Sequence, residues 1–207
     1  LGSRGLGDVY KRQDLESERK NIRIAVNNIN YSLQYVFFSK NRLSLSVANG
    51  YYQLMSNGIP VAPKDISNGE RNIIALCYFF TDILSNLDIQ TAYQREVFLV
   101  IDDPVSSFDK ENRIGILSFL KYQLSRFLLA NQNSKAILLS HDLGTIYDLE
   151  HTAEEIQNAA EIQFGPKSTK FSLFELKDLQ LTEFKYRKRN EYTILMSKVY
   201  NFANGVQ

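Results

Sequence analysis

The sequence predicts an α/β fold in which a mostly parallel sheet is flanked by helices and a small β meander precedes one long helix. Two short apolar runs, 97–101 and 136–139, carry the prediction of the sheet, because each is typical of a buried strand. The segment between them has a helical period, and a strand, a helix and a second strand in this order form a parallel pair. Helical periods elsewhere in the chain predict the flanking helices.

Composition places the chain among ordinary globular domains. It has 207 residues, of which 44% are hydrophobic, and a formal net charge of +1. That balance gives no global electrostatic reason to expect nucleic acid as a partner. The single cysteine, Cys77, excludes a disulfide framework and suits a reducing cytoplasm. Since no stretch has the length of a membrane span and no signal peptide opens the chain, we expect a cytoplasmic domain without a membrane partner.

The first helix is expected over 14–41. Ile22, Val26, Ile29 and Leu33 lie three or four residues apart and form one apolar stripe. The pattern fits the last turns of a long helical arm, and it fits a plain amphipathic helix equally well.

A β meander is expected next, with strands at 43–47, 51–55 and 59–62. Asn-Gly pairs at 49–50 and 57–58 supply the turns between the strands. Because this meander carries no catalytic residue types, we interpret it as scaffold.

A long helix is expected to begin after Ser67. Its apolar stripe consists of Ile73, Leu76, Cys77, Phe80, Ile83, Leu84 and Leu87. Ser67 is a good N-cap, and Glu70 three residues later completes a capping box. Helix structure alone therefore explains both residues.

Two acids, Asp102 and Asp103, follow the apolar run 97–101 directly. A run without polar alternation is typical of a strand that is buried on both faces of a parallel sheet. The carboxyl end of such a strand is where open α/β sheets bind their ligands. Two carboxylates there cost desolvation free energy unless a cation meets them. An acidic turn after a buried strand is the alternative interpretation.

A second strand end is expected to join this acid pair. A helix at 112–131 leads to the strand 136–139, which is followed by a Ser-His-Asp sequence with His141 in the middle. Because adjacent parallel strands end at the same edge of a sheet, we expect His141 to lie beside the two acids. A lone histidine after a strand is more often structural, and it is the neighbouring acid pair that favours a functional role.

The rest of the chain predicts smaller elements. Short strands are expected at 161–164 and 171–176, around a Gly-Pro turn, and a final helix at 181–203. His151 is expected at the surface. Basic residues and one aromatic residue at 185–189 lie in the final helix. They fit a contact with DNA or RNA, and they also fit an ordinary solvated helix face.

The segment 96–109, EVFLVIDDPVSSFD, resembles the Walker B strand and the following D-loop of ABC-type P-loop ATPases. The resemblance implies that Asp102 holds Mg²⁺ and that Asp103 orients or deprotonates the water that attacks ATP. Most of that superfamily has Glu at the second position, and the shorter Asp103 must lie closer to the water. Asp109 matches the D-loop aspartate, which the resemblance places across a dimer interface.

Ser67, Asn68, Gly69 and Glu70 resemble the ABC signature motif, and His141 resembles the switch histidine. The resemblance implies that the serine hydroxyl, the glycine backbone and the helix N-terminus bind the γ-phosphate held by the opposite subunit, and that the histidine contacts this phosphate. A helix N-terminus suits the role because it offers N–H groups and partial positive charge. Asn68 stands where the family usually has a glycine.

The resemblance covers 43–142, with looser similarity to the end, and implies the C-terminal lobe of an ABC-type P-loop NTPase. The interval from Ser67 to Asp102 is longer than in transporter-type domains and is similar to that in SMC and RecN ATPases. No G-x-x-x-x-G-K-[ST] sequence occurs in the chain. We therefore expect the Walker A loop upstream in a longer protein, and no activity from this chain alone.

The resemblance also predicts how the chain is divided. Residues 1–13 have no period and resemble a translated adapter tail, so they are expected to be non-native or disordered. Residues 14–42 are the helix that enters the ATPase head. Residues 43–207 are the C-terminal half-domain of that head.

The wording of the motifs, ISNGE and IDDPVSSFD with R-N-x-Y at 189–192, looks most like the PrrC/RloC family of anticodon-nuclease-linked ATPases. This implies a bacterial defence or stress ATPase that uses ATP and Mg²⁺, forms a homodimer around ATP and controls an effector such as an RNA nuclease. One alternative is a DNA-repair or chromosome-maintenance ATPase of SMC or RecN type. Another is a non-hydrolysing interaction scaffold, in which Asp103 and His141 are incidental.

Overall fold

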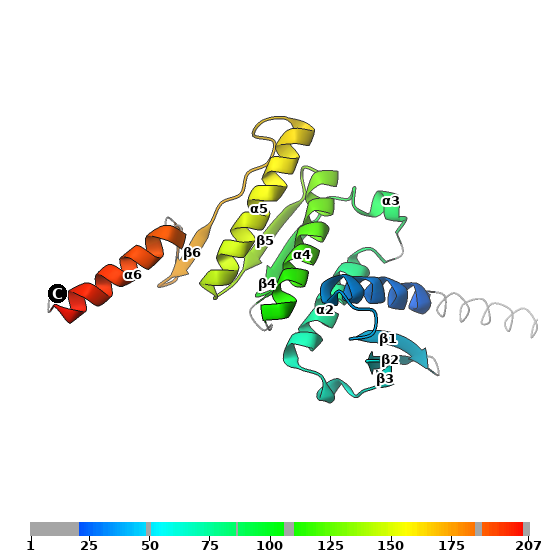
Figure 1. Cartoon of the computed structure of the whole chain (residues 1–207). Helices are drawn as coiled ribbons and strands as arrows, with labels where there is room; N and C mark the ends of the chain where they lie inside the picture. Colours follow the sequence, from blue (N-terminus) through cyan, green and yellow to red (C-terminus); the bar gives the residue numbers. More distant parts are fainter. Residues whose placement is uncertain (1–20, 49–50, 86, 106–109, 185–187, 205–207) are drawn as a thin grey trace, which may run out of the picture. The chain divides into compact units, whose positions relative to one another are not determined.

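The structure is a mixed α/β arrangement of helices and small sheets (Figure 1). The described residues fall into two compact units that divide between Thr145 and Ile146. Their strands form the sheets β1–β2–β3, β4–β5 and β6–β7, of which only β4–β5 is parallel. The larger parallel sheet therefore stays a prediction. The computed structural model describes residues 21–48, 51–85, 87–105, 110–184 and 188–204.

The first helix is described over 21–37, and the predicted apolar stripe is its buried face. The buried side chains are Val26, Ile29, Leu33, Val36 and Phe37. The Asn30 amide donates to the carbonyl of Leu45 at 2.8 Å and accepts from the Leu45 N–H at 2.7 Å. Asn30 thus satisfies the backbone of an outer strand of the meander, as a neighbouring strand would.

The predicted meander is confirmed as an antiparallel sheet. Its strands are β1 (Ser44–Ala48), β2 (Tyr51–Ser56) and β3 (Ile59–Pro60). Gly58 has a φ of 77°, a left-handed conformation that glycine adopts without a steric penalty, and it forms the turn before β3. A short 3₁₀ helix, Pro63–Asp65, then leads to the long helix.

The long helix α2 (Asn68–Ile83) confirms the predicted start and most of the predicted stripe, but it ends before Leu84 and Leu87. Ile73, Cys77 and Phe80 are buried. The Phe80 ring packs edge-on against Phe119 of α4 (Lys110–Ala130), with 5.6 Å between the ring centroids. Burial raises the pKa of the Cys77 thiol to about 12, which marks it as a core residue rather than a reactive thiol.

Helix α4 also lies close to the first helix, because Gly115 has no side chain. A Cβ atom at Gly115 would overlap the carbonyl group of Val36. On α4, Ile116 and Phe119 are buried, whereas Ile114 is 67% exposed. The helix predicted at 112–131 is confirmed, and Gly115 lies on the side of it that meets the first helix.

The parallel pair consists of β4 (Phe98–Asp102) and β5 (Lys135–Leu139). The prediction that the first of these strands is buried on both faces is wrong for the described structure. Leu99 is buried, whereas Phe98 and Val100 on the other face are 64% and 51% exposed. An apolar run shows that both faces of a strand can be buried. It does not show that the described residues cover both faces.

Between α2 and β4 lies a short helix, α3 (Ile89–Ala92), whose Tyr93 neighbour is buried. Burial raises the pKa of the Tyr93 hydroxyl, and the Arg126 guanidinium, 3.8 Å from the ring centroid, partly opposes that rise. This packing ties the chain to α4 shortly before it enters β4.

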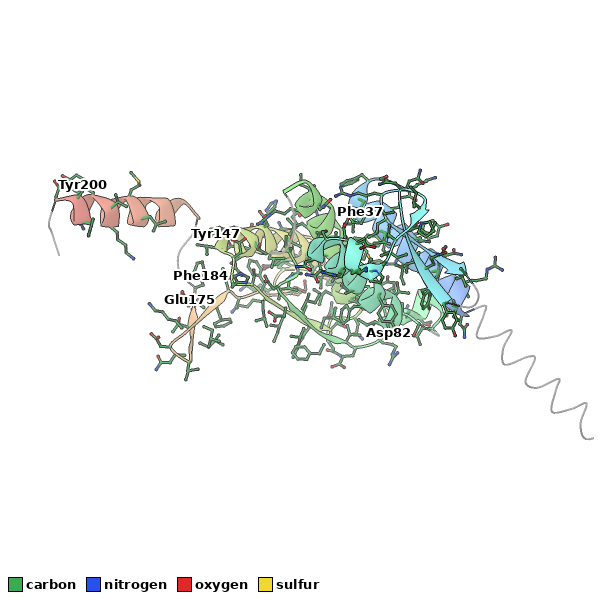
Figure 2. All side chains as sticks on the ribbon, turned by 90° about the horizontal axis from the view of Figure 1, so that it is seen from below. Phe37, Asp82, Tyr147, Glu175, Phe184 and Tyr200 are labelled. Carbon is green, nitrogen blue, oxygen red and sulfur yellow. The ribbon has the colours of Figure 1, made fainter. Side chains whose placement is uncertain are left out.

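The C-terminal unit differs most from prediction. Residues 161–164 belong to the helix α5 (Leu143–Phe164) and not to a strand, and 180–183 form a strand, not the start of a helix. A hairpin of β6 (Phe174–Lys177) and β7 (Gln180–Glu183) precedes the final helix α6 (Lys188–Ala203). Described side chains of α6, including Tyr200, are exposed (Figure 2).

The sequence patterns of α5 and of the β6–β7 hairpin explain why the prediction missed both elements. The buried positions of α5 recur every three or four residues, but several of them are small or polar and so weaken the apolar period. They are Thr145, Leu149, Thr152, Ile156 and Ala160. The hairpin turn uses Asp178 and Leu179 in left-handed conformations, with φ of 50° and 62°, and a leucine gives no turn signal there.

Candidate functional site

The acid pair lies where β4 ends. Asp102 pairs with Leu139 in the parallel ladder, and the N–H of Asp103 donates to the Leu139 carbonyl at 2.8 Å. Asp103 then turns the chain with a φ of 50°, a left-handed conformation that costs a non-glycine residue about 1 kcal/mol. Surrounding contacts must therefore hold Asp103 in place.

Those contacts come from the residues that follow β5. The Ser140 hydroxyl donates to Oδ1 of Asp103 at 3.0 Å. Nδ1 of His141 lies 3.0 Å from Oδ2 of the same carboxylate. The Asp103 side chain is 28% exposed, and the His141 side chain is 80% exposed. The predicted meeting of His141 with Asp103 is confirmed, whereas Ser140 is a contact that sequence reasoning missed.

The carboxylate of Asp142 lies close to Asp103 and His141, because Asp142 follows His141 directly in the sequence. The Oδ2 atom of Asp142 accepts from the Thr145 N–H at 2.7 Å and from the Thr145 hydroxyl at 2.6 Å. The Nη1 atom of Arg113 lies 3.5 Å from the same oxygen. The two hydrogen bonds from Thr145, with help from the Arg113 guanidinium, hold the pKa of Asp142 below its usual value. The N–H of Asp142 donates to the Ser140 hydroxyl at 3.2 Å.

A hollow of about 320 Å³ lies beside the two acids. One wall is the end of β4, with Asp102 and Asp103, and the other is the second turn of α2. Its lining residues are Asn72, Ala75, Leu76, Ile101, Asp102, Asp103 and Pro104. The α2 side of the hollow, with the polar Asn72, was not predicted. It results from how α2 packs against β4, which no local pattern signals.

A larger hollow of about 680 Å³ lies at the opposite end of the strands, where Phe98 pairs with Lys135. Asp102, Asp103 and His141 are not among its lining residues. We take the smaller hollow as the candidate site, because ligands of parallel sheets bind at the carboxyl ends of the strands.

The start of α2 shows the predicted capping box. The Ser67 hydroxyl accepts from the Glu70 N–H at 3.1 Å, and the Ser67 N–H donates to the Glu70 carboxylate at 3.0 Å. The Ser67 hydroxyl also donates to that carboxylate, and the Asn68 side chain accepts from Arg71. The structural part of the prediction is thus confirmed. A phosphate-binding role for Ser67, Asn68, Gly69 and Glu70 stays a prediction.

Asp109, the predicted D-loop aspartate, lies outside the described residues, as do 1–13 and the basic residues 185–187. The described part of the chain contains no group of three or more His, Cys, Asp or Glu residues arranged to hold a metal. Mg²⁺ does not need one, because it commonly binds one or two carboxylates together with phosphate oxygens and water. Asp102 beside an open hollow therefore fits a Mg²⁺ that arrives with a nucleotide.

No helix in the described ranges combines the length and the apolar character needed to cross a membrane.

Comparison with known proteins places the chain in a family. The AAA domain family AAA_13 matches residues 9–206. Two curated Staphylococcus aureus proteins, one of them from strain MRSA252, are each 23% identical to the chain over 200 residues. Both carry the name uncharacterized chromosomal cassette SCCmec type IVc protein CR006. The match covers 96% of this chain and 26% of each relative, so the chain spans about a quarter of their length.

The family match extends over nearly the whole chain and includes both strand ends and the start of α2. The chain therefore belongs to the AAA domain family, whose members are P-loop ATPases of SMC-like type that generally use ATP and Mg²⁺.

Proposed function

We propose that this chain is the C-terminal lobe of an ATP-hydrolysing head of ABC type, and that the hollow beside β4 receives the phosphates of ATP. The observation that carries the proposal is the meeting of Asp103 and His141 at the ends of two parallel strands, next to that hollow. Acidic, polar and imidazole groups lie together there, although the two strands do not need these groups in order to pair.

Each acid has a separate role in this proposal. Asp102 holds Mg²⁺, which neutralises charge on the phosphates. Asp103 orients the attacking water or accepts its proton, which requires a carboxylate in a fixed place. Its two hydrogen-bonding neighbours supply that fixed place. The ring nitrogen Nδ1 of His141 faces Asp103, so the opposite nitrogen, Nε2, is left for the nucleotide, and it donates to a phosphate oxygen when both ring nitrogens carry a proton.

The start of α2 serves the partner head in an ATP-bound homodimer. Its backbone N–H groups and helix dipole suit a γ-phosphate. Gly69 lets the backbone approach phosphate oxygens, and Asn68 flanks them. The Ser67 hydroxyl, which donates to Glu70 here, turns to the phosphate when the partner nucleotide arrives. For Asp109, which lies outside the described residues, we propose a contact across the same interface.

In the wider protein, we propose a cytoplasmic bacterial ATPase of PrrC/RloC type that controls an effector such as an RNA nuclease. The wording of its motifs supports this assignment: ISNGE at the start of α2 and IDDPVSSFD at the end of β4. Residues 14–42 then form the helix entering the head and 43–207 the C-terminal half-domain. A DNA-repair ATPase of SMC or RecN type uses the same site, and it remains the alternative.

The first test compares this chain with a longer protein, here called the complete protein, that adds the Walker A loop we expect upstream. The 207-residue chain lacks the P-loop lysine and backbone cradle, so it should show no Mg²⁺-dependent phosphate release above background and at best weak nucleotide binding by calorimetry. The complete protein should hydrolyse ATP.

Two results would contradict the proposal in different ways. Hydrolysis by the chain alone would show that the site is not half of a divided one. A complete protein that binds no ATP would remove the ATPase assignment itself. Asp102→Asn in the complete protein is the matched variant, and it should weaken Mg²⁺-dependent nucleotide binding.

A further inference from the structure

The Ser140 hydroxyl connects the two carboxylates that follow the parallel strands. We propose that Ser140 is a positioning residue, which fixes the orientation of the Asp103 carboxylate and thereby holds His141 in one tautomer. The inference rests on the proposed ATPase function, to which it adds a residue. It is carried by the hydrogen bonds around Ser140 and by the conformation of Asp103.

The direction of the two hydrogen bonds at Ser140 is set by chemistry. A backbone N–H can only donate, so the Ser140 oxygen must accept from Asp142, at 3.2 Å. The single hydroxyl proton is then available for the Asp103 carboxylate, 3.0 Å away. An ionised carboxylate can only accept, so the Ser140 hydroxyl is the donor in this hydrogen bond.

Ser140 and His141 contact different oxygens of the Asp103 carboxylate. The Asp103 backbone is tied to Leu139 and turned into a left-handed conformation. His141 approaches only one carboxylate oxygen, Oδ2, and the imidazole itself is 80% exposed. With Ser140 on Oδ1 and His141 on Oδ2, both oxygens are held and the carboxylate plane is fixed. A carboxylate has about four lone-pair sites, so these two contacts do not use its whole accepting capacity.

The position of Ser140 does not depend on Asp103. Its oxygen is tied to the N–H of Asp142, and the Asp142 side chain is held by Thr145 and Arg113. These contacts anchor Ser140 to the start of α5 and to α4. Removing the hydroxyl should therefore remove the contact at Oδ1 of Asp103 while leaving the backbone around it in place.

The first measurement observes the histidine directly and needs no activity. The 207-residue chain has two histidines, His141 and His151, so imidazole ¹⁵N–¹H NMR spectra resolve both. The neutral form of His141 should be the Nδ1–H tautomer, because Nδ1 faces the carboxylate. Ser140→Ala should give a mixture of tautomers at His141, and Ser140→Thr should restore the wild-type spectrum.

His151 is the internal control, because it lies on α5 with its Nδ1 3.8 Å from Oε2 of Glu154. Circular dichroism of each variant shows that it is folded before the spectra are compared. A His141 tautomer that is unchanged in folded Ser140→Ala would overturn the proposal, since the carboxylate would then be fixed without the hydroxyl.

The second measurement uses the complete protein. Ser140→Ala should lower kcat roughly tenfold, the usual size for loss of a group that orients a reacting residue, with little change in KM for ATP. Ser140→Thr should recover most of kcat. An unchanged kcat in an active enzyme would overturn the role of Ser140. Absence of hydrolysis in the wild-type protein would instead contradict the proposed ATPase function. The NMR result would still show whether Ser140 fixes the His141 tautomer.

Discussion

The ends of β4 and β5 and the start of α2 are two polar clusters of different kinds. At the strand ends, the hydrogen bond between Ser140 and Asp103 joins residues 37 positions apart in the sequence. At the start of α2, Ser67 and Glu70 bond to each other three positions apart. The first cluster exists only in the folded domain, whereas the second would form in any helix that starts this way.

The difference shows how much each cluster says about function. A capping box lowers the free energy of a helix end, and that gain is sufficient reason for Ser67 and Glu70 to be there. The strand-end cluster has no such local reason, because it places Asp103 in a conformation that costs free energy and leaves His141 mostly exposed. The strand ends therefore give the stronger case for catalysis, and α2 gives the weaker case for phosphate binding.

The largest expected effect is at the strand ends. In the complete protein, Asp103→Asn keeps the size of the side chain but removes its negative charge and its basicity. Hydrolysis should fall by about a hundredfold or more, while ATP and Mg²⁺ still bind and nucleotide-bound dimers accumulate. Single-turnover hydrolysis and ATP affinity, measured together, check the prediction.

A matched control exists in the chain. Asp178, in the turn between β6 and β7, has the same φ of 50° as Asp103. Asp178→Asn therefore makes the same substitution in the same backbone conformation, and it should leave hydrolysis unchanged. If Asp103→Asn hydrolyses ATP at the wild-type rate, the acid pair is an acidic turn, and the contrast between the two clusters disappears.

The next effect concerns α2 and tests whether its cluster is more than a cap. Ser67→Arg should abolish ATP-driven dimerisation of the complete protein and spare ATP binding to the monomer, because a bulky cation would occupy the place of the partner γ-phosphate. Ser67→Ala should cost only about 1 kcal/mol of helix stability. Sedimentation with and without ATP separates the two effects. A Ser67→Arg protein that still dimerises with ATP would leave Ser67 as a cap alone.

The same contrast explains what the sequence could predict of the site. The meeting of His141 with Asp103 follows from one rule, that parallel strands end at the same edge of a sheet. The capping box follows from two residues at a fixed spacing. Asn72 and Arg113 were missed because the packing of whole helices, and no local pattern, brings them to the strand ends. Ser140 was visible beside His141, but its contact with Asp103 was not.

The fold divides in a similar way. Elements with a regular period and a clear start, such as α2 and the meander, were predicted to within a few residues. Helix α5 was missed because Thr145, Thr152 and Ala160 replace large apolar residues on its buried face. The exposed side chains of Phe98 and Val100 could not have been foreseen either, because a sequence pattern does not state which of its faces the same chain covers.

The smallest expected effect concerns Asp142, which supports the strand-end cluster without entering the hollow. Thr145 holds the pKa of Asp142 below its ordinary value, so the carboxylate stabilises the folded state in its ionised form. That contribution is complete above the pKa of the unfolded chain, about 3.9, and is lost as the pH falls through the lower pKa of the folded state. Asp142 precedes α5 and accepts from the Thr145 N–H as a helix N-cap does, so Asp142→Ala should cost about 1 kcal/mol in the free energy of unfolding at pH 7, and less near pH 3. Urea unfolding of the 207-residue chain at both pH values measures the two differences, and Asp142→Asn, which keeps a capping oxygen, should lie between wild type and Asp142→Ala at pH 7. An equal loss at both pH values would show that the ionised carboxylate is not what stabilises the start of α5, and that Ser140 is anchored there by its backbone contact alone.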